Sequence, residues 1–145
     1  MYVKQISVYL ENVRGSLRDM TKTLAENNVD LLALSIADTA NFGIVRLIVR
    51  EKEIPLTIEC MRSAGFMVRM DEVICVAVPN RPAGLDHVLA ILDEAALAVE
   101  YIYSLTLSLQ DAALLVIRAS DNKKAAEVLM KDGITLYGQE ALNQL

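Results

Sequence analysis

The chain has 145 residues, of which 54% are hydrophobic, and a formal net charge of −5. The acidic balance opposes non-specific binding to nucleic acid, which depends on the neutralisation of phosphates by lysine and arginine. No apolar run approaches the roughly 18 residues that a membrane-spanning helix needs, so we expect no membrane interaction.

The first residues, Met-Tyr-Val-Lys-Gln, lack the basic segment and the long apolar stretch of a secretion signal. The two cysteines, Cys60 and Cys75, are not spaced as a zinc or redox pair. Both are expected to be buried thiols, which suits a reducing compartment. We therefore expect a cytoplasmic protein with no metal and no cofactor.

The expected elements follow the order strand, helix, strand, strand, helix, strand, and this order occurs twice. Apolar, β-branched segments predict the strands, and the i, i+3, i+4, i+7 spacing of apolar residues predicts the helices. Turns are expected at Thr39-Ala40-Asn41 and Gln110-Asp111, and the tail from Gln139 is expected to form a short helix or to fray. In chain order, the predicted elements are a strand at 3–10, a helix from about residue 15, strands at 30–38 and 43–50, a helix at 54–64, strands at 66–72 and 73–79, a helix from about residue 83, strands at 98–109 and 112–118, and a helix at 121–132.

The second helix of each half carries capping residues. Pro55 suits the first turn of one helix, and Asp121 is the expected N-cap of the other. Gly65 and Gly133 stand where a glycine commonly ends a helix, so they predict the two C-terminal caps.

The second half of the chain repeats the first at a constant offset of 68 residues. The segment Asn12-Val13-Arg14-Gly15-Ser16-Leu17 corresponds to Asn80-Arg81-Pro82-Ala83-Gly84-Leu85, each time between an apolar strand and an amphipathic helix. A duplication this regular predicts two similar domains related by an approximate two-fold axis. The identical pairs at this offset are Ile6/Ile74, Val8/Val76, Asn12/Asn80, Leu17/Leu85, Leu24/Leu92, Glu26/Glu94, Leu47/Leu115, Arg50/Arg118, Glu59/Glu127 and Gly65/Gly133.

The order βαββαβ, present twice, predicts an α+β protein with two ferredoxin-like domains in tandem. In each domain, four antiparallel strands would lie under two helices on one face. We place the domains at residues 1–71 and 72–145, with no flexible linker between them. Because domains of about 70 residues are marginally stable alone, we expect contact between the halves or between the subunits of a homodimer.

The apolar residues of the two predicted hairpins alternate in opposite phase. In the second half, residues 99–109 are apolar mainly at odd positions, whereas in the first half residues 32–36 are apolar at even positions. Two explanations remain open. One copy has a β-bulge, or the sheet is covered on both faces by a partner subunit.

The loop before the first helix of each half has the chemistry of a ligand site. The first N–H groups of a helix are unpaired and carry a partial positive charge, so this loop offers an anion site. Gly15 or Gly84 would let a ligand approach the backbone, and the amide of Asn12 or Asn80 can both donate and accept hydrogen bonds. An α-amino acid would suit this layout, although the same residues are also ordinary helix-entry chemistry.

No pattern of catalytic residues is present, and we expect no enzymatic activity. The sequence contains no Ser-His-Asp, Cys-His, HExxH or phosphate-loop arrangement. His87 is the only histidine, so a His-based metal pair is excluded and a solvated surface position is favoured. RNA binding by such a fold would need aromatic residues on the open sheet and a basic surface, which this composition does not favour.

The repeated βαββαβ order, with the loops Asn12–Leu17 and Asn80–Leu85, resembles the ACT domain family and its loop motif Asn-x-Pro-Gly-x-Leu. Nearly the whole chain is similar to a tandem pair of ACT domains with no enzyme attached. Members of the family bind amino acids or other small metabolites where two domains meet, and binding usually regulates an enzyme. The resemblance therefore implies an allosteric regulatory protein that binds an amino acid between ACT-like domains and acts on a partner enzyme.

The resemblance also implies which residues bind the ligand. Asn12 and Asn80 match the loop asparagine of the family, and Asp30 stands where some members place an asparagine at the start of the second strand. Ala98 takes that position in the second half and cannot bond a ligand, so we expect two unequal sites, the first being the better. The candidate residues are Asn12, Val13, Arg14, Gly15, Ser16, Leu17 and Asp30 in the first half, and Asn80, Arg81, Pro82, Ala83, Gly84 and Leu85 in the second.

Both loops depart from the family motif. The first has Arg14 in place of the proline, which makes the loop less rigid but offers a cation near the site. The second has Ala83 in place of the glycine, with Gly84 one residue later, which would allow a shifted start of its helix.

A second class of function remains open. The repeats would then form a scaffold for oligomerisation or for docking to a partner enzyme, and the loops would bind nothing. A thermal-shift screen with the twenty amino acids distinguishes the two, because a ligand at about 100 times its Kd adds about 2.7 kcal/mol of stability.

Overall fold

The computed structural model describes residues 1–38 and 41–145, so the turn predicted at Thr39-Ala40-Asn41 falls mainly outside the described residues. The chain divides into two compact units. The first unit is Lys4–Asp71, and the second is Glu72–Leu145 together with Met1–Val3. Helices and antiparallel strand pairs occur in both units, which confirms the predicted α+β class with antiparallel sheets.

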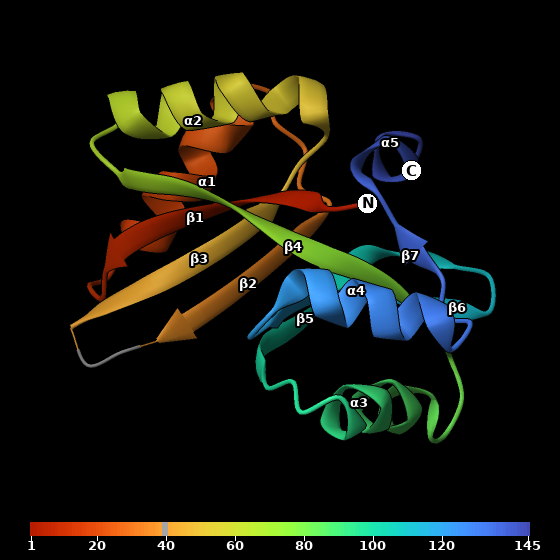
Figure 1. Ribbon diagram of the computed structural model, residues 1–145. Helices are drawn as coiled ribbons and strands as arrows, with labels where there is room; N and C mark the ends of the chain where they lie inside the picture. Colours follow the sequence, from red (N-terminus) through yellow and green to blue (C-terminus); the bar gives the residue numbers. More distant parts are fainter. Residues whose placement is uncertain (39–40) are drawn as a thin grey trace. The chain divides into compact units, whose positions relative to one another are not determined.

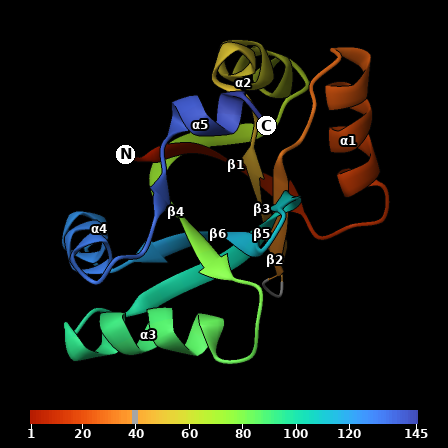
Figure 2. The same cartoon turned by 90° about the vertical axis from the view of Figure 1, so that its right-hand side faces the viewer.

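In the first unit, two helices cover one face of the strands (Figures 1 and 2). The third strand pairs with the first on one side and with the second on the other, and the first strand also pairs with the fourth. The core between sheet and helices is mainly apolar, as the alternating strands and helix stripes predict, and it includes the buried Thr57 of α2. The elements are β1 (Val3–Glu11), α1 (Ser16–Glu26), β2 (Ala33–Asp38), β3 (Phe42–Ile48), a 3-10 turn at Glu51–Glu53, α2 (Ile54–Ser63) and the start of β4 (Met67–Pro79).

In the second unit, the strands follow the order β5, β6, β4, β7, and two helices again pack on one face of them (Figure 1). The strands predicted at 66–72 and 73–79 form one continuous strand, β4. The tail forms a short helix with Leu142 buried, so of the two alternatives for the tail the helix is the one found. The elements after β4 are α3 (Gly84–Glu94), β5 (Val99–Leu109), β6 (Ala112–Ala119), α4 (Asn122–Lys131), β7 (Leu136–Tyr137) and α5 (Gln139–Asn143).

Strand β5 is bulged, but the bulge does not account for the opposite phases of the two hairpins. The register between β5 and β6 shifts between Val99 and Tyr101 and again between Ser104 and Ser108. Ile102 therefore lies opposite the core residue Ile117 and points to the helix side. Its counterpart 68 residues earlier, Leu34, lies opposite a core residue of β3 in the same way.

The shift near Val99 does not bring the odd-numbered residues after it to the helix side, because Tyr101 and Tyr103 lie opposite Arg118 and Val116, on the face away from Ile102. Val116 and Leu114 on that face are buried. A bulge is therefore present, but the covered second face is what accounts for the apolar odd positions of β5.

The predicted caps are confirmed. The Asp121 side chain accepts a hydrogen bond from the backbone N–H of Lys124 at 3.0 Å, which caps α4. Pro55 lies in the first turn of α2. Gly65 and Gly133 have φ values of +90° and +81°, the left-handed conformation that ends a helix.

Both cysteines are buried and free, as predicted. Burial raises the pKa of the Cys60 thiol, and it raises the pKa of the Cys75 thiol to about 12. Within residues 1–38 and 41–145, no helix combines the length and the hydropathy that crossing a membrane requires.

Candidate functional site

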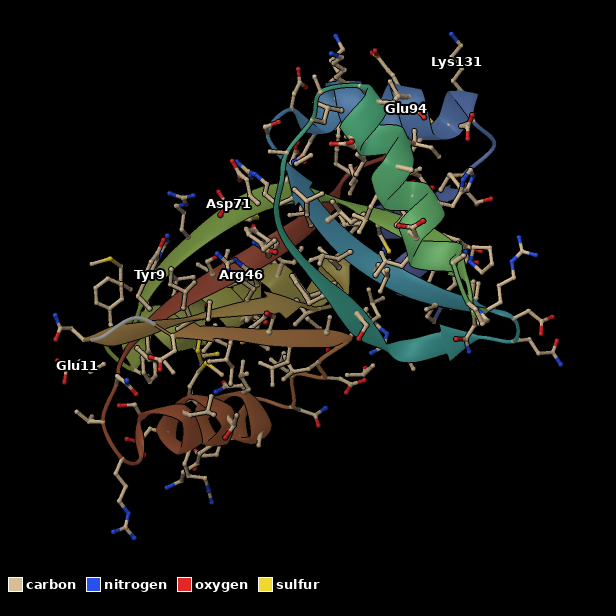
Figure 3. All side chains as sticks on the ribbon, turned by 90° about the horizontal axis from the view of Figure 1, so that it is seen from below. Tyr9, Glu11, Arg46, Asp71, Glu94 and Lys131 are labelled. Atoms are coloured by element: carbon tan, nitrogen blue, oxygen red, sulfur yellow. The ribbon has the colours of Figure 1, made fainter. Side chains whose placement is uncertain are left out.

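A pocket of about 250 Å³ lies in the first unit where β1 ends and α1 begins. Figure 3 shows Glu11 at this end of β1, beside the chain that leads into α1. The volume is slightly below the roughly 300–1,000 Å³ of pockets for drug-sized ligands, so it fits a small metabolite. The pocket is lined by Leu10, Glu11, Asn12, Val13, Ser16, Leu17, Ile36, Asp38, Gly43 and Val45.

The strand register brings the lining residues together. Leu10 lies opposite Gly43 across β1 and β3, and Gly43 lies opposite Asp38 across β3 and β2. The ends of β1 and β2 therefore meet at the start of β3. There the side-chain amide of Asn12 donates a hydrogen bond to the Asp38 carboxylate, with Nδ2 and Oδ1 3.0 Å apart.

The start of α1 provides the hydrogen-bond donors of the pocket. Gly15 has a φ of +93° and precedes the helix without a side-chain cap. The N–H groups of Ser16 and Asp19 bond to backbone carbonyls of the loop. The N–H groups of Leu17 and Arg18 are then the donors of the first turn that an external anion can use. By contrast, α4 is capped by the side chain of Asp121.

The pocket combines two charge preferences with an apolar wall. The carboxylates of Glu11 and Asp38 favour a cationic group, and the start of α1 favours an anionic one. Leu17 and Ile36 also line the pocket and are 39% and 50% exposed, so their apolar surface is still open to a ligand. A zwitterion with an apolar substituent matches this arrangement.

The structure places only some of the predicted residues of the first site in this pocket. Asn12, Val13, Ser16 and Leu17 line it, whereas Arg14 and Gly15 are not among its described lining residues. The residues that the sequence reasoning missed are Leu10, Glu11, Ile36, Asp38, Gly43 and Val45. The predicted hairpin of 30–38 with 43–50 contained a signal for Asp38 and Gly43. It places these two residues on either side of its turn, at the same end of the sheet as the end of the first strand.

Asp30 lies away from this pocket. It precedes β2, whereas the pocket is at the other end of that strand, and six strand residues span roughly 17 Å at about 3.3 Å per residue. Its carboxylate pairs with Arg50, with an N–O distance of 2.9 Å. In the first unit, Asp38 and not Asp30 accompanies the loop that begins at Asn12.

The second loop has the same backbone course as the first. Its helix begins at Gly84, 68 residues after Ser16, so the start of the helix is not shifted. Ala83 itself adopts the left-handed conformation, with a φ of +67°. Gly84 has a different role, because a Cβ at this residue would come within 2.2 Å of the carbonyl oxygen of Pro79. Gly84 is therefore not the counterpart of Gly15 shifted by one residue, because Gly15 is needed for its positive φ and Gly84 for the close approach of Pro79.

The second loop also borders a pocket of about 250 Å³, but one of different composition. Its described lining contains no acidic residue and no residue of β5, so the acidic partner and the apolar wall of the first pocket are missing. His87 is exposed, with its Nε2 3.5 Å from Asp132. Of the predicted residues, Asn80 and Leu85 are outside the described lining, which comprises Pro79, Arg81, Pro82, Ala83, Gly84 and His87.

Comparison with solved structures identifies similar proteins. Protein BT0572 from Bacteroides thetaiotaomicron is 35% identical, with a TM-score of 0.89 over 100% of this chain and 98% of that one. The regulatory subunit of aspartate kinase from Thermus thermophilus is 12% identical, with a TM-score of 0.63 over 90% and 91% of the two chains. The corresponding subunit from Thermus flavus is 11% identical, with a TM-score of 0.61 over 90% and 92%. These two show a shared fold.

The comparison with curated protein sequences gave no match. The family model described as an ACT domain pair matches residues 1–145. The chain therefore belongs to the ACT domain family, as a pair of ACT domains.

Proposed function

We propose that this protein is a non-enzymatic regulator that binds an amino acid in the pocket at Asn12, Leu17 and Asp38. The observation that carries the proposal is the pocket itself, where the uncapped start of α1 and the Asn12–Asp38 pair face one small space. The α-carboxylate would accept from the N–H groups of α1, and the α-ammonium would donate to Asp38 and to the Oδ1 of Asn12.

The wider features of the proposal follow from the family. Aspartate kinase regulatory subunits share this fold, which supports a role in regulation. We propose two ferredoxin-like domains, at 1–71 and 72–145, in a cytoplasmic homodimer that acts on a partner enzyme. A second ACT domain would close over the bound ligand, so that binding favours one domain arrangement over another.

Calorimetry with the twenty amino acids, after a thermal-shift screen, tests the proposal. We expect one class of amino acid to bind and Asp38→Asn to weaken its affinity by about 10- to 100-fold, since a charge-assisted hydrogen bond contributes about 1.5–3 kcal/mol. Asp30→Asn makes the same chemical change outside the pocket and should leave the affinity unchanged. Asn12→Ala should weaken binding far more than its counterpart Asn80→Ala.

The alternative function is a scaffold for oligomerisation or docking. The exposed apolar side chains of Leu17 and Ile36 favour it, because they would serve a protein contact as well as a ligand. If no amino acid raises the melting temperature or gives heat of binding, the scaffold is favoured over the amino-acid regulator. If Asp30→Asn weakens the affinity for the amino acid as much as Asp38→Asn does, the ligand does not bind in this pocket.

A further inference from the structure

A second pocket in the first unit lies between α1 and α2 and does not involve the loop at Asn12. Its volume is about 420 Å³. The two helices pack against each other, and the groove is lined by the last turn of α1 and by one side of α2. The residues that matter here are Glu26, Asn27, Leu56, Glu59, Cys60 and Ser63. We refer to this pocket as the α1/α2 groove.

The α1/α2 groove has a negative character. Glu26 and Glu59 contribute carboxylates, and its described lining contains no lysine or arginine. The end of α1 adds the negative pole of a helix whose last turn has no basic residue. Lys22 approaches Glu26 at 3.7 Å, but both side chains are more than half exposed, so this pair neutralises the groove little.

In the second unit, a lysine ammonium lies at the position equivalent to this groove. At the offset of 68, Lys124 corresponds to Leu56 and Ala95 to Asn27. The ammonium of Lys124 donates a hydrogen bond to the carbonyl oxygen of Ala95 at 3.0 Å. The cation therefore occupies the end of α3, the equivalent of the end of α1. A second lysine, Lys131, stands at the position of Ser63.

The first unit has the same acidic residues as the second but neither of the two lysines. Glu26 and Glu59 correspond to Glu94 and Glu127 of the second unit, whereas Leu56 and Ser63 replace the two lysines. Leu56 is 41% exposed, so the groove offers apolar surface beside its carboxylates. A metal ion is not the matching ligand, because no group of three or more metal-ligating side chains occurs in the part of the chain that the structure describes.

We propose that the α1/α2 groove docks a lysine or arginine side chain carried on an apolar segment of a partner protein. The charged end takes the place that the Lys124 ammonium takes in the second unit, and the aliphatic stem and its apolar neighbours pack on Leu56. This docking site is independent of the amino-acid pocket, and it supplies the contact through which a regulator reaches its target.

Two capped peptides that differ only in charge test the proposal. They are acetyl-Leu-Ala-Lys-Ala-Leu-amide and the same peptide with norleucine in place of lysine, titrated into the ¹⁵N-labelled protein. The lysine peptide should shift the amide signals of Asn27, Leu56 and Ser63, and the norleucine peptide should bind at least about tenfold more weakly. Added salt should weaken only the binding of the lysine peptide.

Variants of the two units give matched controls. Leu56→Lys supplies the first unit with the internal cation of the second and should abolish the shifts. The double variant Lys124→Leu, Lys131→Ser removes both cations of the second unit and should open a second site near Ala95. Glu59→Gln should weaken binding several-fold and Glu127→Gln should not. Because these positions are on the surface of their helices, thermal denaturation of each variant verifies that it remains folded.

Four outcomes would overturn the docking site. These are equal affinities for the two peptides, unchanged binding by Leu56→Lys, shifts confined to other residues, and butylammonium binding as tightly as the lysine peptide. The last outcome would make the groove a site for small amines. Asn12→Ala should leave peptide binding intact, so the two proposals can fail separately.

Discussion

The left-handed residue before each first helix gives a sharp prediction about stability. Gly15 and Ala83 occupy equivalent positions, with φ values of +93° and +67°. An L-residue in this conformation costs roughly 1–2 kcal/mol, whereas glycine costs nothing comparable. Glycine, in turn, loses about 0.4–1 kcal/mol more chain entropy than alanine on folding. We therefore expect Ala83→Gly to stabilise the protein by about 0.5–1 kcal/mol.

The reciprocal change should have the opposite sign and a larger size. A Cβ on Gly15 would meet no atom within 4 Å, so the cost of Gly15→Ala is conformational and not steric. The φ of Gly15 lies farther than that of Ala83 from the left-handed value of about +57°, so the loop must also move. We expect a loss of about 1–2 kcal/mol.

Urea denaturation and thermal scans of the two variants measure these differences. One kcal/mol corresponds to roughly 2–4 °C in melting temperature for a chain of this size. Hydrogen exchange at the amides of Asp19 and His87, which bond to the carbonyls of Gly15 and Ala83, assigns each effect to its own loop. If Ala83→Gly proves destabilising, the left-handed conformation of Ala83 is not strained, and the reasoning fails.

Three further predictions concern single residues. Gly84→Ala should destabilise the protein by more than Gly15→Ala, because its Cβ would overlap the carbonyl oxygen of Pro79; equal losses of denaturation free energy would contradict this. Asp121→Ala removes the bond to the N–H of Lys124 and should cost about 0.5–2 kcal/mol in urea denaturation, whereas no loss would show that the cap is dispensable. The Cys75 thiol has a pKa raised from 9.0 to about 12, so between those pH values the unfolded chain has lost a proton that the folded chain keeps. Stability should fall as pH rises through this window, by up to about 1.4 kcal/mol per unit. The slope should decrease in Cys75→Val, and an unchanged slope would exclude this thiol as the cause.

Local patterns in the sequence were sufficient for most of the fold. Apolar periodicity located the helices and strands, and Asp121 and Gly65 marked helix ends because a cap depends on neighbours within one turn. The bounds of β2 were less well predicted, since residues 30–32 precede the strand that begins at Ala33. Strand ends depend on pairing with another strand, which local pattern does not report.

The candidate site was predicted in part, for the same reason. Asn12 and Leu17 belong to the loop motif, and both line the pocket. Asp38 was missed, although it directly precedes the turn that the sequence predicts at Thr39-Ala40-Asn41. Its approach to Asn12 follows from the pairing of three strands, and such a register is a long-range property of the sheet.

The duplication, the element order and the family motif are determined by the sequence alone, because each is written in local patterns that repeat after 68 residues. Only the tertiary structure decided how the copies differ. It showed that Ala83 takes the strained conformation and that β5 is bulged. It also paired Asp38, and not Asp30, with the first loop. Those outcomes depend on strand register and on close backbone approach, which join residues far apart in the chain.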